Sequence, residues 1–507
     1  MNATITSIIS HGSGGIPVEI ECHLSNSLPN IVIVGAATRT VEEAKERVRG
    51  AFSNSGLQMP RKRISINLAP ADVPKHSSSL DIAIAVAILC ADNQLSYSPS
   101  EHESFIGELG LDGTIRPVRG LIGKLMAGRA RGIHRYYFPA SIIRQAQLVP
   151  QIELVPVGNL RELYEHLQGM QPIAIQNTGT GAAISRTTTT PKCLPAGLDD
   201  IVGQAQAKRA LEVAAAGGHN LLLSGPPGTG KTMLARALAS LLPPMSREEI
   251  LEVTQLHSLA GTEYGRLVTE RPVRSPHHSA SYIAVIGGGS TIRPGEVSLA
   301  HRGVLLFDEL PEFGRQTIEA LRQPLEDTVI TVSRARDSVQ YPADFLFVAT
   351  ANPCPCGYHN ARTGKRCECP PHAINRYRQK LSGPLLDRID ISVAVEHVEH
   401  NRLLQSTSGE HQTQAAAKRV ARARQRQQER FGDAIWLNSH LSNRDIRDKA
   451  VVSPAAKALL DRSAASLKLS ARAYMRCLKV ARTIADLDDS HAVESHHITE
   501  AVQYRHG

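Results

Sequence analysis

The sequence contains no apolar run near the roughly 20 residues that a membrane-spanning helix requires. Its N-terminus also lacks the basic start and the long apolar stretch of a secretion signal. No internal repeat stands out, and outside one short segment the cysteines are scattered. A membrane protein, a secreted protein and a disulfide framework are therefore not expected, and we predict a cytoplasmic location without a membrane partner.

The chain is long and slightly basic. Its 507 residues exceed what one hydrophobic core supports and predict about three domains. The 57 Lys and Arg outnumber the 48 Asp and Glu, which gives a formal net charge of +9. This excess mildly favours a polyanionic partner such as nucleic acid, but charge alone equally fits ordinary solubility.

Four stretches of different pattern divide the chain. Residues 1–170 alternate strand-like and helix-like runs, which predicts a compact α/β domain. Residues 171–197 have little periodicity and many small polar residues, which is typical of a linker. Residues 198–396 contain strands that are apolar on both faces, the pattern of a doubly wound parallel sheet. Residues 397–507 predict a helical lid domain. Its helix N-cap signals are Ser442, Ser453 and Ser490.

A glycine-rich loop directly follows an apolar strand and opens a helix. Its residues are Gly225, Pro226, Pro227, Gly228, Thr229, Gly230, Lys231 and Thr232. This order of strand, loop and helix is the context that a phosphate-binding P-loop needs. We expect backbone N–H groups to surround the phosphates of ATP, Lys231 to reach the β and γ phosphates, and Thr232 to ligate Mg²⁺. A purely structural glycine loop is the alternative, at odds of roughly one in twenty.

Two carboxylates and an amide follow later apolar strands. Asp308 and Glu309 end one strand, so Asp308 is expected to hold Mg²⁺ and Glu309 to activate water. Without a P-loop, such a pair would indicate solvated surface. Asn352 ends the next strand, where its amide could orient the attacking water. A turn-forming Asn before Pro353 explains the residue nearly as well on local grounds.

Two arginines lie far from the P-loop along the chain. Arg388 stands in Gly-Pro-Leu-Leu-Asp-Arg, just before a predicted strand, and Arg472 stands in Ser-Ala-Arg-Ala near the C-terminus. Together with the P-loop, the Asp-Glu pair and the following Asn, these segments resemble AAA+ ATPases of the magnesium-chelatase branch. Across the whole chain the sequence resembles the ComM (YifB) family.

The resemblance implies a role for each of these residues. Asn352 is the first sensor, Arg388 an arginine finger facing the ATP of a neighbouring subunit, and Arg472 the second sensor. Arg476, one helical turn after Arg472, is a possible substitute that only geometry can decide. Because such fingers contribute about 10³ to 10⁵ in rate, the resemblance implies a homo-oligomeric ring, a hexamer, as a condition of activity.

Half of the cysteines form one cluster. They are Cys354, Cys356, Cys367 and Cys369. Four thiolates at this spacing are within reach of one tetrahedral ion, and soft thiolates favour Zn²⁺ in a closed, structural site. The alternative is four reduced thiols without metal, at odds of roughly one in three, because the C-x-C spacing is unusual. His359 and His372 could also compete as ligands.

Two basic inserts are candidates for gripping a substrate. The long stretch before Asp308 contains Arg274 and Arg293, whereas Arg334 and Arg336 lie at the tip of a predicted hairpin. Both inserts resemble the pore elements of the chelatase and replicative-helicase branch. Arginines around a pore would contact DNA phosphates without reading bases. An ordinary solvated basic surface is about equally consistent with the sequence.

The N-terminal domain contains Pro70-Ala-Asp-Val-Pro-Lys75, Gly107-Glu-Leu109 and, before a predicted helix, Gly120-Leu-Ile-Gly-Lys124. These segments resemble the proteolytic domain of Lon. Lys124 falls at the catalytic lysine of that family, but Lys75 stands where a nucleophilic serine is required. A lysine cannot serve as an acyl-transfer serine. We therefore predict a domain without peptidase activity, retained for ring assembly or DNA contact.

The leading prediction is a DNA translocase or helicase that acts without sequence preference on single-stranded, branched or duplex DNA. The ComM resemblance links this activity to branch migration during natural transformation. Two other functions stay open: a chelatase motor subunit for metal insertion, and an unfoldase or regulatory scaffold that grips polypeptide. Against the first, the Lon-like domain and the cysteine cluster depart from a simple chelatase subunit. Against the second, the inserts lack aromatic pore-loop signatures.

Overall fold

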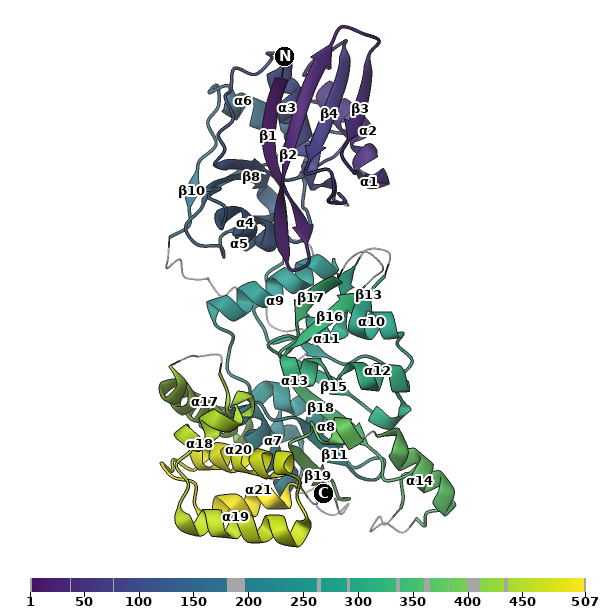
Figure 1. Cartoon of the computed structure of the whole chain (residues 1–507), viewed down its shortest axis with the longest axis vertical. Coiled ribbons are helices and arrows are strands. Elements are labelled where there is room, and N and C mark those ends of the chain that lie inside the picture. The colour runs from purple at the N-terminus through teal and green to yellow at the C-terminus, as the bar shows by residue number, and fades with distance from the viewer. Residues whose placement is uncertain are drawn as a thin grey trace.

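The structure is a computed structural model that describes residues 2–36, 38–75, 77–179, 197–261, 266–289, 292–333, 338–359, 365–381, 383–398, 411–432 and 436–505. Figure 1 shows an elongated molecule with the N-terminal unit at one end and the C-terminal helices beside the core at the other. Within these ranges, no helix combines the length and the apolar character needed to cross a membrane.

The first sheet of the N-terminal unit has four strands in the order β1-β2-β4-β3. Its strands are β1 (Asn2–His11), β2 (Gly14–Ser25), β3 (Asn30–Val34) and β4 (Arg63–Ala69). β1 and β2 form a long antiparallel hairpin, and β3 is parallel to β4. Helix α3 (Asp81–Ala91) is apolar on nearly every side and is buried against β1 and β2, as an all-round hydrophobic helix must be. Two further helices are α1 (Arg39–Glu42) and α2 (Ala44–Asn54).

The second sheet of this unit has the order β10-β9-β8-β5. Its strands are β5 (Glu103–Phe105), β8 (Arg135–Pro139), β9 (Glu153–Val157) and β10 (Gln176–Asn177). The neighbouring elements are β6 (Glu108–Leu109), β7 (Ile115–Arg116), α4 (Leu121–Arg129), α5 (Ile143–Ala146) and α6 (Leu160–Leu167). Because β10 pairs with β9, the first residues of the predicted linker 171–197 belong to this sheet, whereas residues 180–196 lie outside the described residues.

The core sheet is five-stranded and parallel throughout, which confirms the predicted doubly wound architecture. In spatial order the strands are β12 (Val273–Arg274), β15 (Val304–Phe307), β18 (Leu346–Ala351), β11 (Leu221–Ser224) and β19 (Ile391–Ala394). Leu221 and Leu223 face one hydrophobic core, and Leu222 faces the other. Both faces of the sheet are therefore covered, which explains its near-continuous apolar strands.

Helices and short insertions surround this sheet. The helices nearest the P-loop are α7 (Ala205–Gly217) and α8 (Lys231–Ala237), and α8 continues as the 3₁₀ turn η4 (Leu238–Leu241). The insertions contain α9 (Arg247–Ala260), α10 (Tyr282–Ile286), β13 (Gly287–Gly288), β14 (Arg293–Pro294), α11 (Glu296–Leu299), η5 (Leu310–Glu312), α12 (Arg315–Ala320) and α13 (Pro324–Asp327). The predicted hairpin is present as β16 (Val329–Ser333) and β17 (Ser338–Pro342). Between β18 and β19 lie α14 (Pro371–Lys380) and α15 (Gly383–Leu386).

The C-terminal region is helical. Its helices are α17 (Gln412–Phe431), α18 (Asn443–Lys449), α19 (Pro454–Leu467), α20 (Ala471–Leu487) and α21 (Ser495–Gln503). The hydroxyls of Ser442 and Ser453 accept the expected N-cap hydrogen bonds, from Asp445 and Ala456. The prediction for Ser490 is wrong, because the last helix begins at Ser495. α17 and α20 pack on α7, so the lid shares one hydrophobic core with the sheet.

Helix α9 joins the N-terminal unit to the ATPase core (Figure 1). Its apolar side packs on α4, and the buried Val253 belongs to the same cluster as Leu121 and Leu125. The hydroxyl of Ser258 accepts a hydrogen bond of 2.9 Å from the backbone N–H of Gly120. The contact is thus a continuous small core rather than a set of surface bridges.

We predict that Val253→Asp uncouples the two units, because it places an unpaired carboxylate in an apolar cluster at a cost of several kcal/mol. Calorimetry of this variant should show a separate transition at lower temperature for the N-terminal unit. Glu248→Gln, at an exposed position of the same helix, is the control. A single transition unchanged from that of the parent protein would contradict the prediction.

Candidate active site

The glycine-rich loop joins β11 to α8 in a shape that only small residues permit. A Cβ on Gly225 would lie 2.3 Å from the carbonyl oxygen of Val395. Gly228 and Gly230 have φ values of +79° and +86°, in the left-handed region that favours glycine. The loop backbone therefore follows the close path that phosphate binding by N–H groups requires, at the N-terminus of α8.

Lys231 lies buried beneath this loop. Its Nζ donates to the carbonyl oxygens of Gly225 and Pro226, at 2.8 and 2.7 Å, and to Oδ1 of Asn352 at 3.1 Å. Burial lowers the pKa of Lys231, while Asp308 and Glu309 oppose the shift. The ammonium group is thus desolvated and bound only by neutral oxygens. The phosphates of ATP would provide it with the anionic partner that these oxygens do not.

Thr232 and Asp308 meet as an Mg²⁺ site needs. The hydroxyl of Thr232 donates to Oδ2 of Asp308 at 3.0 Å, so a hydroxyl and a carboxylate, the oxygen ligands that Mg²⁺ prefers, stand together. Thr350 donates to Oδ1 of the same carboxylate at 2.6 Å and accepts from the backbone N–H of Glu309 at 2.9 Å. Thr350 thus orients both carboxylate residues, but it was not predicted as a site residue. The one feature that could have indicated it is a hydroxyl in an otherwise apolar strand.

The predicted arginines lie at the opposite edge of the sheet. In a parallel sheet all carboxyl ends share one edge, and Gly225, Asp308 and Asn352 follow carboxyl ends. Arg388 precedes β19, and its carbonyl accepts from the side chain of Asn220, which precedes β11. At about 3.3 Å per residue, strands of this length separate the two edges by roughly 13 Å. Arg388 therefore cannot reach the phosphates bound by its own P-loop.

Glu326 brings together the predicted arginine finger and the predicted second sensor. Its carboxylate binds Arg388, and Arg472 reaches it at 3.1 Å. Arg476 instead pairs with Asp390 at 3.5 Å and is 13% exposed, against 42% for Arg472. Geometry thus favours Arg472 over Arg476 as the group available to a neighbour. Glu326 was not predicted, since an exposed glutamate on a short helix carries no sequence signal.

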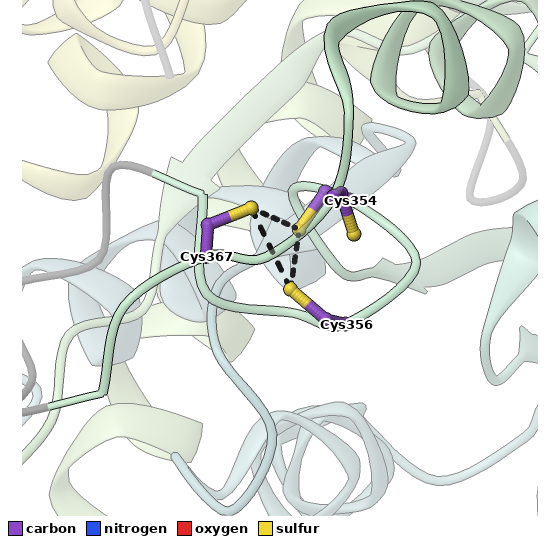
Figure 2. Close-up of side chains that lie close together, drawn as sticks. Cys354, Cys356 and Cys367 are labelled. Atoms are coloured by element: carbon purple, nitrogen blue, oxygen red, sulfur yellow. Dashed lines mark hydrogen bonds between the residues drawn. The ribbon is translucent and has the colours of Figure 1, made fainter.

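The four clustered cysteines converge, and Figure 2 shows the side chains of three of them, Cys354, Cys356 and Cys367, close together. The Sγ atom of Cys354 lies 3.3 Å from that of Cys356 and 3.7 Å from that of Cys367, and Cys356 and Cys367 are 3.6 Å apart. With Cys369, all four sulfur atoms lie within 4.8 Å of one another. A tetrahedral Zn²⁺ with bonds of about 2.3 Å requires sulfur separations of about 3.8 Å. The donor set and its size therefore fit one Zn²⁺ ion.

The cluster also has the hydrogen bonds that thiolate ligands accept. The backbone N–H of His359 donates to Sγ of Cys354 at 3.3 Å. The backbone N–H of Tyr358 lowers the pKa of the Cys356 thiol to about 6. His359 thus contributes its backbone, and the group that converges consists of thiols.

A second group of metal-type side chains, Asp488, His496 and His497, lies in the C-terminal region. Nδ1 of His497 accepts a hydrogen bond of 2.9 Å from the backbone N–H of Glu494, so its Nε2 carries the proton. A protonated nitrogen cannot ligate a metal. This group therefore fits an ion poorly.

The predicted DNA contacts divide into three cases. Arg274 lies in β12 and binds both carboxylate oxygens of Glu296, at 2.5 and 2.6 Å, so its charge is already neutralised. Arg293 is exposed on the short ribbon of β13 and β14. Arg334 and Arg336, which follow β16 and precede β17 in the sequence, lie outside the described residues.

The two lysines of the Lon-like site are both fully buried. Nζ of Lys75 donates to the carbonyl oxygens of Leu68, at 3.1 Å, and of Pro70. Nζ of Lys124 has no hydrogen-bond partner among the described residues, and burial lowers its pKa to about 7. A lysine bound to backbone carbonyls thus stands where the resemblance to Lon requires a serine, and the absence of peptidase activity stays a prediction.

Together, the parallel sheet, the P-loop, the Asp-Glu pair and the helical lid define a AAA+-type P-loop ATPase. The family model described as "Magnesium chelatase, subunit ChlI" matches residues 197–403. Two related models, "Subunit ChlI of Mg-chelatase" and "Magnesium chelatase, subunit ChlI C-terminal", match residues 20–141 and 410–505. The chain is 41% identical over 499 residues to the protein YifB of Salmonella typhimurium, covering 97% of this chain and 95% of the relative. It is 40% identical over 505 residues to "Competence protein ComM" of Haemophilus influenzae, covering 98% and 97%.

These matches run the length of both partners, and the chain therefore belongs to the ComM (YifB) family of magnesium-chelatase-like AAA+ proteins. A separate stretch of 74 residues is 43% identical to an archaeal Lon protease of Methanothermobacter thermautotrophicus, covering 14% of this chain and 12% of that protein.

We predict that Lys124→Met stabilises the N-terminal unit, because an unpaired buried amine costs about 1–3 kcal/mol. The folded pKa, about 7, lies below the ordinary value of 10.5, so the unfolded chain binds more protons between these values. The stability of the parent protein should therefore rise with pH across this window, and the advantage of Lys124→Met should shrink. Thermal unfolding at pH 7 and pH 9.5 measures both effects. A variant less stable at pH 7 would contradict the prediction.

Proposed function

We propose that this protein is a ring-shaped, ATP-driven DNA translocase or helicase that promotes branch migration while transforming DNA is integrated. The observation that carries the proposal is the split nucleotide site. The P-loop and its acidic pair lie at one edge of the sheet, and Arg388 and Arg472 lie at the other. A complete site then forms only between two subunits, which supports a closed homo-oligomer, a hexamer in our proposal.

The residues of one chain would divide the work as follows. Bound Mg-ATP supplies the γ-phosphoryl group whose transfer to water releases the energy. Lys231 and the loop N–H groups hold the phosphates, and Thr232 and Asp308 hold Mg²⁺. Glu309 accepts a proton from the attacking water, and Asn352 positions that water. Arg388 and Arg472 of the adjoining subunit stabilise the charge on the phosphoryl oxygens.

DNA is the substrate that the comparisons and the charge favour together. A relative that matches nearly the whole chain is named for competence, the uptake of DNA. The net charge of +9 and the exposed Arg293 fit a phosphate-binding surface, to which we add Arg334 and Arg336. Arg274, already paired with Glu296, is left out. We propose contact with DNA phosphates, independent of sequence, in a cytoplasmic protein.

The cysteine cluster would hold one structural Zn²⁺ ion through Cys354, Cys356, Cys367 and Cys369. Sulfur separations of 3.3–3.7 Å and the N–H donors on Cys354 and Cys356 support this assignment.

A magnesium-chelatase motor is the second candidate, since the three chelatase models together match most of the chain. Such a motor would hydrolyse ATP without any response to DNA. It would instead require a porphyrin-binding partner protein.

The split site predicts complementation between two inactive variants. Lys231→Ala removes phosphate binding and Arg388→Ala removes the neighbour's contribution, so each protein alone should lose most ATPase activity. Co-assembled in equal amounts, about a quarter of the interfaces would pair an intact P-loop with an intact arginine. We expect the mixture to recover a measurable fraction of the parent activity. If each chain instead completed its own nucleotide site, the two variants would not complement each other. Arg462→Ala, on an exposed face of α19, is the matched control.

The proposed substrate predicts ATPase activity that DNA stimulates. ATP hydrolysis should rise with single-stranded and forked DNA and the stimulation should fade as salt increases, because phosphate contacts release counterions. Glu309→Gln provides the hydrolysis-deficient control. ATPase activity indifferent to every DNA would contradict the translocase and favour the chelatase-like motor.

A further inference from the structure

The cysteine loop lies directly against the P-loop. A Cβ built on Gly357 would lie 2.5 Å from Cδ and 3.0 Å from Cγ of Pro227, inside the phosphate loop. Gly357 has φ +86°, a conformation that glycine adopts without strain. It directly follows Cys356, one of the proposed metal ligands. The P-loop at Pro227 therefore contacts the backbone of the cysteine loop at Gly357.

A second connection runs through the proposed first sensor. Asn352 accepts the hydrogen bond of Lys231, and Cys354 follows it by two residues. The Cys354 side chain is fully buried, whereas the other three thiols are partly exposed. A metal bound at Cys354 would therefore fix the chain on which the amide of Asn352 is carried.

The far end of the loop leads to the segment after Glu309. Cys369 is followed by α14, which packs on η5, the turn that begins just after Glu309. Lys380 of α14 pairs with Glu312 of η5 at 3.4 Å. The hydroxyl of the buried Tyr377 is also within bonding reach of the Asn352 backbone, a contact that opposes the rise in its pKa.

We propose that the metal-loaded cysteine loop is a positioning element of the nucleotide site. It fixes the P-loop through Gly357 and Pro227, the first sensor through Cys354, and the segment after Glu309 through α14. Without the ion, only weak hydrogen bonds join the four cysteine side chains, and the loop loses the metal–sulfur bonds that hold it in place. This inference rests on the proposed Zn²⁺ site and ATPase activity, but it does not depend on DNA as the substrate.

The decisive variant is Gly357→Ala, which leaves all four thiols in place. The added methyl group meets Pro227 and strains the left-handed backbone, so the P-loop must shift. We expect unchanged zinc content, a KM for ATP raised roughly tenfold and a lower kcat in the absence of DNA. Gly432→Ala is the matched control, because that glycine has φ +73° but no atom of the described residues within 4 Å of its Cβ. It should leave ATP hydrolysis unchanged.

Two further variants separate the contact from general damage. Pro227→Ala removes the ring atoms that the new methyl group meets, so adding it to Gly357→Ala should recover part of the ATP affinity that Gly357→Ala alone loses. Cys367→Ser with Cys369→Ser should release the metal and reduce basal hydrolysis at least as much as Gly357→Ala. Thermal unfolding and elution volume would show that each variant remains folded.

Each outcome has a defined meaning. Zinc at one ion per chain, a KM effect in Gly357→Ala and partial recovery by Pro227→Ala support the proposal. Normal hydrolysis in Gly357→Ala, or in the metal-free double serine variant, overturns it. Parent protein without bound zinc overturns it as well. Basal hydrolysis is measured without DNA. If DNA does not stimulate the protein, the translocase proposal fails, but these results still test the role of the cysteine loop.

Discussion

The polarity of one parallel sheet governs the arrangement of the whole nucleotide site. Since every strand runs in the same direction, the loops that follow the strands meet at one edge, and the segments that precede them meet at the other. The P-loop, Asp308 and Asn352 take the first edge. Arg388 takes the second, and the lid brings Arg472 to it. No rotation of a side chain can span the length of the strands, so Arg388 cannot meet the phosphates held by the P-loop of its own chain.

The same sheet explains why the lid is a part of the ATPase core rather than an appendage. Leu221 and Leu223 on one face share a continuous core with α7, α17 and α20. The opposite face packs with the insertions, and beyond these α9 carries the N-terminal unit. A change in the strands can therefore reach the lid by packing and the N-terminal unit by the α9 contact, along two separate faces.

Much of the cofactor side of this site followed from the sequence, because each residue stands directly after an apolar strand and parallel strands converge. The cysteine cluster could likewise be predicted from its spacing. The residues that support or contact these site residues could not be predicted. Thr350 looks like any β-branched residue of a strand, and the left-handed backbone of Gly357 has no signature in the letters. Glu326 gains its role from residues far along the chain, and Ser490 carried a cap signal that the chain does not use.

In the proposed ring, the pairing of Arg388 and Arg472 with Glu326 would make closure an exchange of one anion for another. For either guanidinium to contact a phosphate across the interface, it must leave a carboxylate that already satisfies it, so only the difference between the two partners drives closure. Glu326 is 47% exposed, and water can solvate the abandoned carboxylate at small expense. In the proposed ring, such a contact could therefore form and break with each nucleotide instead of staying fixed.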